Sequence, residues 1–270
     1  MASTSHAQFS GSIPALYDLH LGPVIFEPYA RDLAARVPAH DGVRVLETAA
    51  GTGIVTRQLL ARLPASARLT VTDLNQGMLD HAASVLPADA RAEWQTADAQ
   101  SLPFSDATFD AVVMQFGIMF VPDKPLALRE ARRVLKPGGK LLLNSWDSFA
   151  RNPFGRVANE VVKSIFPEDP PTFYQTPFGD HDPAEHIARA EAAGFREVRV
   201  EGVAVESHSE SAAHFAVGLV RGNPISIAIT ERGTHTHEEV EARIALALRR
   251  EMGDRPVVAP LHAWVVTASA

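Results

Sequence analysis

The sequence predicts an α/β fold: a Rossmann-like, doubly wound, seven-stranded and mostly parallel sheet with an antiparallel edge strand and helical lid insertions. Apolar segments of strand length alternate with amphipathic helical segments over residues 42–147, and a glycine-containing turn follows the first strand. Residues 109–116 form a near-continuous apolar run, which is typical of a central strand covered by helices on both faces. With 270 residues, 46% of them hydrophobic, the chain can form one α/β core with insertions.

The elements of this core follow one another in a regular order. We expect strands at residues 43–48, 68–73, 92–97, 109–116 and 140–146. We expect helices at residues 54–63, 75–86 and 123–135, where apolar side chains recur at helical spacing. Residues 136–139, Lys-Pro-Gly-Gly, are expected to end the last of these helices.

The chain beyond residue 147 is less regular. A helix at 183–193, a strand at 195–206, helices within 209–251 and a final strand at 257–268 are expected. The last two strands are expected to pair antiparallel at the sheet edge. The predicted domains are an N-terminal helical cap (1–41), a ligand-binding core (42–147), a lid insertion (148–182) and a C-terminal part of the core (183–270) with a helical insertion at about 209–251.

Composition excludes several classes of protein. The net charge is −7 and no basic patch is visible, which argues against a nucleic-acid partner. The absence of cysteine excludes disulfides, zinc–thiolate sites and a cysteine nucleophile. Residues 1–21 contain no Lys or Arg and no long apolar stretch, so a signal peptide is not expected, and no run nears the roughly 18 apolar residues of a membrane span. We therefore expect a cytoplasmic protein.

The most informative segment is the turn at residues 46–53, Leu-Glu-Thr-Ala-Ala-Gly-Thr-Gly. In a doubly wound sheet, ligands bind outside the carboxyl ends of the strands. Small side chains there let backbone N–H groups approach a ligand, and Gly51 and Gly53 also permit a positive φ. Two glycines alone fit an ordinary strand-to-helix loop equally well.

Charge near this turn favours a cationic ligand. A dinucleotide fingerprint would have a third glycine where Thr56 stands, and a pyrophosphate would be repelled by the Glu47 carboxylate. Asp73, at the end of the second strand, can accept hydrogen bonds from a ribose diol, although an N-cap role is the alternative interpretation. Asp98, after the third strand, can accept a hydrogen bond from an adenine amine.

Together these residues resemble class I S-adenosylmethionine (SAM)-dependent methyltransferases, in the ubiquinone/menaquinone-biosynthesis-like branch called methyltransferase type 11. The resemblance covers about residues 40–147. Its most specific block is residues 129–139, Arg-Glu-Ala-Arg-Arg-Val-Leu-Lys-Pro-Gly-Gly. One departure is Ala49, where the family usually has glycine.

The resemblance implies SAM as the cofactor and a set of residues that bind it. Glu47 would lie near the SAM ammonium, Asp73 would hold the ribose, and Tyr17 would belong to a segment covering the cofactor. The implied cofactor-binding residues are Tyr17, Glu47, Ala49, Gly51, Thr52, Gly53, Asp73, Leu74, Met78, Asp98, Ala99 and Gln115.

The predicted acceptor site is lined by apolar and aromatic side chains, which fit a hydrophobic or planar molecule. Its candidate residues are Phe26, Phe116, Met119, Trp146 and Tyr174, each of which fits core packing as well. No general base can be named from the sequence. Two histidines and two carboxylates at residues 235–239 suggest a metal, but Thr236 and Glu239 have the spacing of a capping box, so no metal site is expected.

The sequence thus predicts methyl transfer from SAM to a small organic acceptor by in-line displacement. Two other hypotheses stay open: a non-catalytic SAM-binding protein and an NAD-dependent oxidoreductase. The expected partner is a small-molecule acceptor, with neither nucleic acid nor a membrane span. The sequence leaves the oligomeric state open, a homodimer included.

Overall fold

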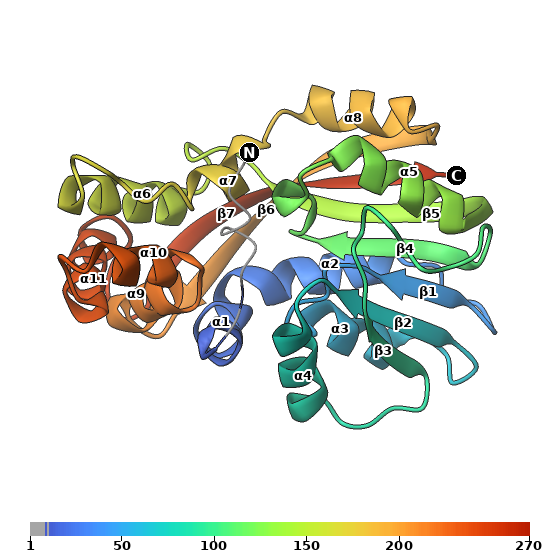
Figure 1. Ribbon diagram of the computed structural model, residues 1–270, viewed down its shortest axis with the longest axis horizontal. Helices are drawn as coiled ribbons and strands as arrows, with labels where there is room; N and C mark the ends of the chain where they lie inside the picture. Colours follow the sequence, from blue (N-terminus) through green and yellow to red (C-terminus); the bar gives the residue numbers. More distant parts are fainter. Residues whose placement is uncertain (1–8, 10) are drawn as a thin grey trace. The chain divides into compact units, whose positions relative to one another are not determined.

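A computed structural model describes residue 9 and residues 11–270 and contains a seven-stranded sheet with the order β3-β2-β1-β4-β5-β7-β6 (Figure 1). The strands are β1 (Arg44–Glu47), β2 (Arg68–Asp73), β3 (Ala92–Thr96), β4 (Phe109–Gln115), β5 (Leu135–Trp146), β6 (Arg196–Ser209) and β7 (Val257–Ser269). The pairs from β3 through β5 are parallel. β7 runs antiparallel to β5, since Gly138 donates to the Ala270 carbonyl and Ala270 donates back to Gly139. The predicted fold class is confirmed.

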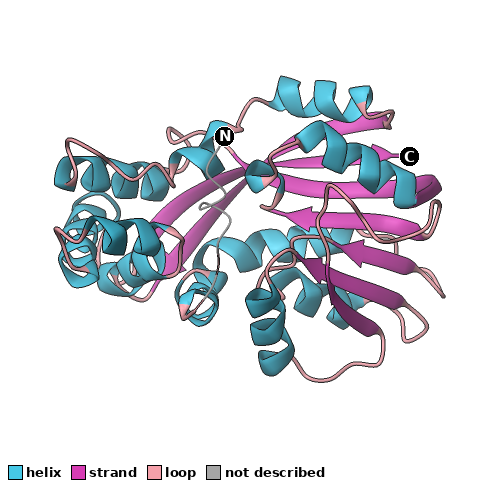
Figure 2. Ribbon diagram, viewed as in Figure 1, coloured by secondary structure: helices cyan, strands magenta, loops and turns pink. Residues whose placement is uncertain are grey.

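Helices separate β1 from β2, β2 from β3 and β4 from β5, and more helices follow β5 (Figure 2). The helices are α1 (Ile13–His20), α2 (Glu27–Arg36), α3 (Ile54–Arg62), α4 (Gln76–Val85), α5 (Lys124–Val134), α6 (Pro153–Ile165), α7 (Gln175–Gly179), α8 (Pro183–Ala192), α9 (Ala212–Arg221), α10 (Ile225–Arg232) and α11 (His237–Met252). A π-helix spans Gly22–Phe26 and a 3₁₀ turn spans Ile118–Phe120. None of the helices in the described part of the chain is both long and apolar enough to span a membrane.

One predicted boundary is wrong. The strand expected at 140–146 begins at Leu135, directly after α5, and includes the Lys-Pro-Gly-Gly segment. Leu135 pairs with Phe109, and the register then shifts before Ala111 pairs with Lys140. An irregularity of this kind lets extra residues stay within a strand. Helix α5 ends at Val134, before this segment, so the glycines do not end it as expected. They lie within β5 and pair with Ala270.

The chain forms two compact units. The first contains the described residues up to 28, together with 146–180 and 204–262, and the second contains residues 29–145, 181–203 and 263–270. The second unit therefore carries the parallel part of the sheet, and the first carries most of the helices after β5. The four-part division expected from the sequence stays a prediction beside these two units.

The second unit has its hydrophobic core on one face of the parallel strands, under α5 and α8 (Figure 1). Leu46, Val112 and Leu141 alternate with residues of the opposite face, so that one side chain in two points into this core. α5 contributes Leu128 and α8 contributes Ala190. Burial of both faces of the sheet explains why residues 109–116 read as a continuous apolar run.

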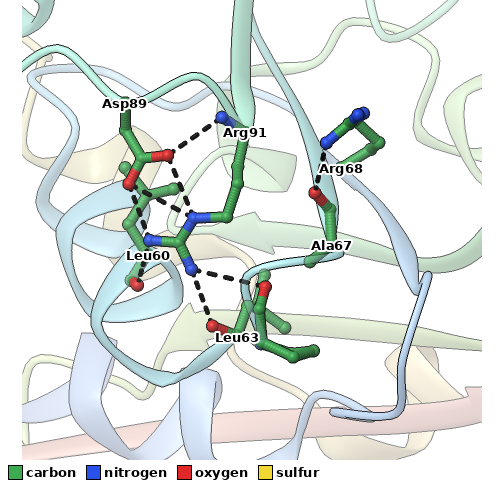
Figure 3. A network of polar contacts seen from close by, with 7 residues as sticks. Leu60, Leu63, Ala67, Arg68, Asp89 and Arg91 are labelled. Atoms are coloured by element: carbon green, nitrogen blue, oxygen red, sulfur yellow. Dashed lines mark hydrogen bonds and ion pairs between the residues drawn. The ribbon is translucent and has the colours of Figure 1, made fainter.

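The amino-terminal side of β3 is tied to the end of α3 by Arg91 (Figure 3). Its guanidinium donates to the carbonyls of Leu60 and Leu63, each at 2.7 Å, and forms an ion pair with Asp89 at 2.6 Å. The last carbonyls of a helix have no partner within the helix, so a cationic side chain that binds them stabilises that end. Arg91 therefore caps α3.

The first unit has an aromatic core. The rings of Trp146, Phe154 and Phe178 contact one another, with centroids 5.6–6.1 Å apart, and Phe154 also contacts Phe215 of α9. Gly155 fits beneath Phe178, since a Cβ at this position would lie 2.3 Å from its ring atoms. Helix α11 packs against α6 and α9.

Candidate functional site

The turn after β1 places its two glycines in different surroundings. Gly51 and Gly53 both have positive φ, 58° and 79°. A Cβ at Gly53 would lie 2.8 Å from Leu86, so this glycine permits close packing of the turn on α4. A Cβ at Gly51 would meet only Met78, at 3.7 Å, so Gly51 leaves space beside the turn. Gly51 is therefore the position where a ligand can approach the backbone.

Asp73 connects the ends of the first two strands. Its carboxylate accepts hydrogen bonds from the backbone N–H of Gly51 at 2.9 Å and of Asn75 at 2.8 Å. The N-cap of α4 is Asn75, so the structure does not give Asp73 the alternative N-cap role. Burial raises the pKa of Asp73, against the lowering effect of these hydrogen bonds. Asp73 is thus a buried acceptor fixed at the carboxyl end of β2.

Glu47 lies at the end of β1 and is only 2% exposed. Its carboxylate accepts a hydrogen bond from the Thr56 hydroxyl at 2.7 Å. Burial, with a smaller contribution from the nearby Asp73 carboxylate, raises the pKa of Glu47 to about 8. A carboxylate in this state gains charge when a cation approaches, which suits the predicted ammonium partner. The role of Thr56 was not foreseen, because in the sequence it only marks a missing glycine.

The loop after β4 lies against the same turn. A Cβ at Gly117 would lie 2.6 Å from the Ala49 Cβ, so these two backbones pack closely. Phe116 has a positive φ of 49°, and its N–H donates to the Asn144 side chain at 2.9 Å. Gln115, which ends β4, pairs with Asn144 of β5. Sequence reasoning missed Asn144 and Gly117, whose partners lie far away along the chain.

The remaining predicted cofactor residues follow β2 and β3. Leu74 is 61% exposed and Met78 is buried, so the two side chains lie in different environments. Asp98 accepts a hydrogen bond from the backbone N–H of Gln100 at 2.8 Å and orders the loop that also holds Ala99. Register in the parallel sheet brings the ends of β1, β2 and β4 to one edge, since Glu47 pairs with both Val71 and Val113.

The predicted acceptor residues are buried in both units. Phe116 and Met119 belong to the second unit. The ring of Phe116 contacts Tyr29 edge-on, with the ring centroids 5.4 Å apart. The other candidates belong to the first unit: Phe26, Trp146, Tyr174 and the cofactor candidate Tyr17. The ring of Tyr17 stacks on the ring of Phe26, with their centroids 4.6 Å apart. The Tyr174 hydroxyl donates to the Leu219 carbonyl at 2.6 Å, which gives Tyr174 a packing role.

The capping box at α11 is confirmed. The Thr236 hydroxyl accepts from the Glu239 N–H, and the Glu239 carboxylate accepts from the Thr236 N–H. Within the described ranges, no three His, Cys, Asp or Glu side chains are grouped so that they could hold a metal ion. His237 instead contacts the Ser226 carbonyl, at 2.9 Å from its Nε2.

An open parallel sheet with an acidic residue before its first turn and a second acid at the end of β2 defines a nucleotide-binding domain of the Rossmann-like class. Residues 46–143 match the family model described as a methyltransferase domain. This segment of the chain is therefore a methyltransferase domain, similar to the one in ubiquinone and menaquinone biosynthesis C-methyltransferases.

Known proteins are similar to the chain mainly across this domain. It is 43% identical over 106 residues to the ubiquinone/menaquinone biosynthesis C-methyltransferase of Paracoccus denitrificans, covering 38% of this chain and 42% of that protein. The corresponding protein of Hahella chejuensis is 34% identical over 166 residues, covering 59% of this chain and 64% of the relative. The chain thus spans about half the length of the curated relatives it matches.

Solved structures share the fold over most of the chain. A phosphoethanolamine N-methyltransferase 2 of Haemonchus contortus, solved with S-adenosyl-L-methionine, has a TM-score of 0.63 at 17% identity, covering the whole of this chain and 60% of its own. The YcgJ protein of a Bacillus species has a TM-score of 0.58 at 18% identity, covering 90% of this chain and 98% of its own. At these identities the likeness establishes the fold alone.

Proposed function

We propose that this protein transfers a methyl group from SAM to a small, apolar or planar organic acceptor by in-line displacement. The observation that carries the proposal is the turn in which the Asp73 carboxylate holds the Gly51 N–H, with Glu47 buried directly before it. Asp73 accepts hydrogen bonds from backbone N–H groups, whereas Glu47 accepts one from the Thr56 hydroxyl. Gly51 between them leaves space for a ligand at the end of the parallel sheet. The relatives named as C-methyltransferases support this choice of reaction.

The residues present fit SAM. The space beside Gly51, which a Cβ would enter, allows the methionine part to approach the backbone. Glu47 would face the cationic end, and Asp73 would accept from the ribose hydroxyls while keeping its bond to Gly51. Asp98 and Ala99 would meet the adenine edge, and Leu74 and Met78 its faces. Bound SAM would supply an electrophilic methyl group on a positively charged sulfur.

The protein's own contribution is orientation. Holding an acceptor in line with the methyl carbon can supply about 7–11 kcal/mol of the barrier in favourable intramolecular systems. The Gly51 N–H donates to Asp73 and the Phe116 N–H donates to the Asn144 side chain, and these bonds fix two adjacent loops at the carboxyl edge. Fixed loops of this kind hold the cofactor in a single position, which an in-line displacement requires.

The two other hypotheses are less well supported. An NAD-dependent oxidoreductase would be expected to have a third glycine at the position of Thr56, whose hydroxyl instead donates to the Glu47 side chain at 2.7 Å. A non-catalytic SAM-binding protein would share the turn, but the relatives that the chain resembles carry methyltransferase names. A homodimer and a cytoplasmic location both stay predictions.

The experiment that tests the proposal is turnover with an acceptor panel. Purified protein is incubated with SAM and a set of hydroquinones, phenols and carboxylates, and formation of S-adenosylhomocysteine is measured. We expect turnover with a hydroquinone or phenol. SAM binding without turnover of any acceptor would favour the non-catalytic alternative, and no SAM binding would contradict the proposal as a whole.

A further inference from the structure

The sheet ends in a long and exposed edge strand. Strand β6 is the last in the strand order, so within the described part of the chain its outer edge has no neighbouring strand. It has 14 residues, none of residues 196–206 is buried, and the strand at the other end, β3, has only five residues. Shortness, proline and lysine protect many edge strands from pairing with another chain, and residues 196–203 contain neither proline nor lysine. The edge of β6 is therefore a candidate interaction surface.

The two faces of β6 differ in chemistry. Val198 and Val200 pack against the hydrophobic core of the second unit. Side chains alternate along a strand, so Arg199 and Glu201 belong to the opposite face. On that face Glu201 forms an ion pair with Arg36 at 2.7 Å. Arg36 and, more weakly, Arg199 lower the pKa of Glu201, so this carboxyl group stays charged beside an arginine of the same strand.

Two observations limit the part of this edge that can pair regularly. Glu197 has a positive φ of 51°, which interrupts the extended backbone at that residue. At the other end, the Val203 carbonyl accepts a hydrogen bond from the Tyr29 hydroxyl at 3.2 Å. The regular segment is therefore residues 198–202, with Val200 at its centre. All of these residues belong to the second unit.

The charges of this segment are complementary to those of a second copy of itself. When two copies pair antiparallel about a two-fold axis at Val200, Arg199 of each copy lies opposite Glu201 of the other. Opposite residues of an antiparallel pair lie on one face with Cβ atoms about 4.5–5.5 Å apart, which is close enough for an ion pair. An axis at Arg199 would instead place Arg199 opposite itself and Glu197 opposite Glu201, and like charges in opposite positions are destabilising.

We propose that β6 pairs antiparallel with β6 of a second copy of this chain, centred on Val200, and that the two sheets become one. Each Arg199–Glu201 pair then occurs twice across the two-fold axis. Because the regular segment is short, the dimer is reversible and forms as the protein concentration rises. The inference goes beyond the proposed function and uses none of the residues proposed to bind SAM.

Two charge reversals test this register. In the Arg199→Glu dimer, acidic side chains would lie opposite each other at positions 199 and 201, and in the Glu201→Arg dimer basic ones would do so. Sedimentation equilibrium at a series of protein concentrations measures the dissociation constant of the dimer. We expect a monomer–dimer equilibrium for the unsubstituted protein and a dissociation constant raised about 10-fold or more in each variant, because like charges meet across the interface.

An equimolar mixture of the two variants tests the pairing itself. The Arg199→Glu chain presents two acids at positions 199 and 201 and the Glu201→Arg chain presents two bases, so a mixed dimer regains both pairs of opposite charge. We expect the mixture to dimerise about as strongly as the unsubstituted protein. Native mass spectrometry identifies the mixed dimer, since the two substitutions change the chain mass in opposite directions. A register centred on Val198 would place residue 201 opposite Phe195 and would be insensitive to Glu201→Arg.

The matched control is Glu93→Arg. Glu93 is an exposed residue of β3, the strand at the opposite end of the sheet, and reversal of its charge should leave the dimer unchanged. Thermal unfolding of every variant shows whether it folds. A dimer restored in the mixture also excludes a folding defect, because both substitutions are then present.

Several results would overturn the inference. They are a monomer at every concentration, a dimer that neither reversal weakens, and a loss of dimer that the mixture of variants does not restore. A dimer weakened by Glu93→Arg would place the interface at β3 instead. Calorimetry with SAM on the same samples keeps the two proposals apart, since the site proposed for SAM shares no residue with this edge.

Discussion

The Asp73 carboxylate accepts a hydrogen bond from the backbone N–H of Gly51 at 2.9 Å, and this bond joins the ends of β2 and β1. A second bond from the Asn75 N–H fixes the other carboxylate oxygen at 2.8 Å. The acid is therefore oriented before any ligand binds. Such preorganisation lowers the ordering cost of binding.

Asp73→Asn should weaken SAM binding by about 10-fold or more, because charged hydrogen bonds contribute roughly 1.5–3 kcal/mol each. The amide keeps only one acceptor oxygen, while two backbone N–H groups and a ribose require acceptors. Calorimetry with SAM measures the change. The control is Asp89→Asn, since Asp89 likewise accepts from a backbone N–H two residues on, that of Arg91. An equal loss in both variants would contradict the assigned role.

Gly51→Ala should reduce SAM affinity more than it reduces stability. The positive φ costs about 1–2 kcal/mol for an alanine, but the new Cβ would make only an ordinary contact with Met78. Ala49 already has a positive φ of 53° in this turn, so the fold tolerates such a residue. Gly42→Ala is the control, because Gly42 has a φ of 70° with no atom near its Cβ position. If both variants bind SAM equally well, no ligand lies against Gly51.

Glu47 should make the stability of the free protein depend on pH. Burial raises its pKa from the ordinary 4.5 to about 8 in the folded state. Between these values the folded protein keeps a proton that the unfolded chain has lost, so stability falls as pH rises through this range. Glu47→Gln keeps an acceptor for Thr56 and removes the titration.

Urea unfolding at pH 5 and pH 8 measures this effect. We expect the unsubstituted protein to lose at least about 1 kcal/mol more than Glu47→Gln between the two pH values, since each pKa unit is worth about 1.4 kcal/mol. Parallel pH profiles for the two proteins would show that Glu47 ionises normally in the fold.

Arg91→Ala should destabilise the protein by about 1–2 kcal/mol without changing SAM affinity. The substitution removes the hydrogen bonds to the Leu60 and Leu63 carbonyls that cap α3 (Figure 3). Arg91→Lys should recover only part of the loss, because an ammonium cannot reproduce the planar fork of a guanidinium. Urea unfolding and calorimetry together check this; an affinity loss larger than tenfold in Arg91→Ala would place Arg91 closer to the site than its contacts indicate.

Local patterns in the sequence were sufficient for much of the fold. Strand β2 has the predicted bounds, and the ends of α3 and α4 lie within a residue or two of their predicted positions. Apolar periodicity and turn residues determine these elements because both act over short distances along the chain. The early start of β5 could not be predicted, since it depends on pairing with Ala270. The glycine turn and Asp73 could be recognised because they too form a short pattern along the chain.

Contacts between distant residues explain what the sequence did not reveal. The bond from Phe116 to Asn144 and the pair of Asp147 with His262 join different strands, so neither forms a spacing that can be read along the chain. The hydrogen bond of Glu47 to Thr56 spans nine positions and became visible only once α3 was placed after the turn. The raised pKa of the buried Glu47 likewise depends on this three-dimensional arrangement.

The measurement that tests the account most directly is calorimetric titration of the purified protein with SAM, S-adenosylhomocysteine and NAD. We predict that SAM and S-adenosylhomocysteine bind with dissociation constants between about 1 µM and 1 mM, the usual range for enzyme substrates, and that NAD does not bind. Binding of NAD in preference to SAM, or no binding of SAM at millimolar concentration, would contradict the account.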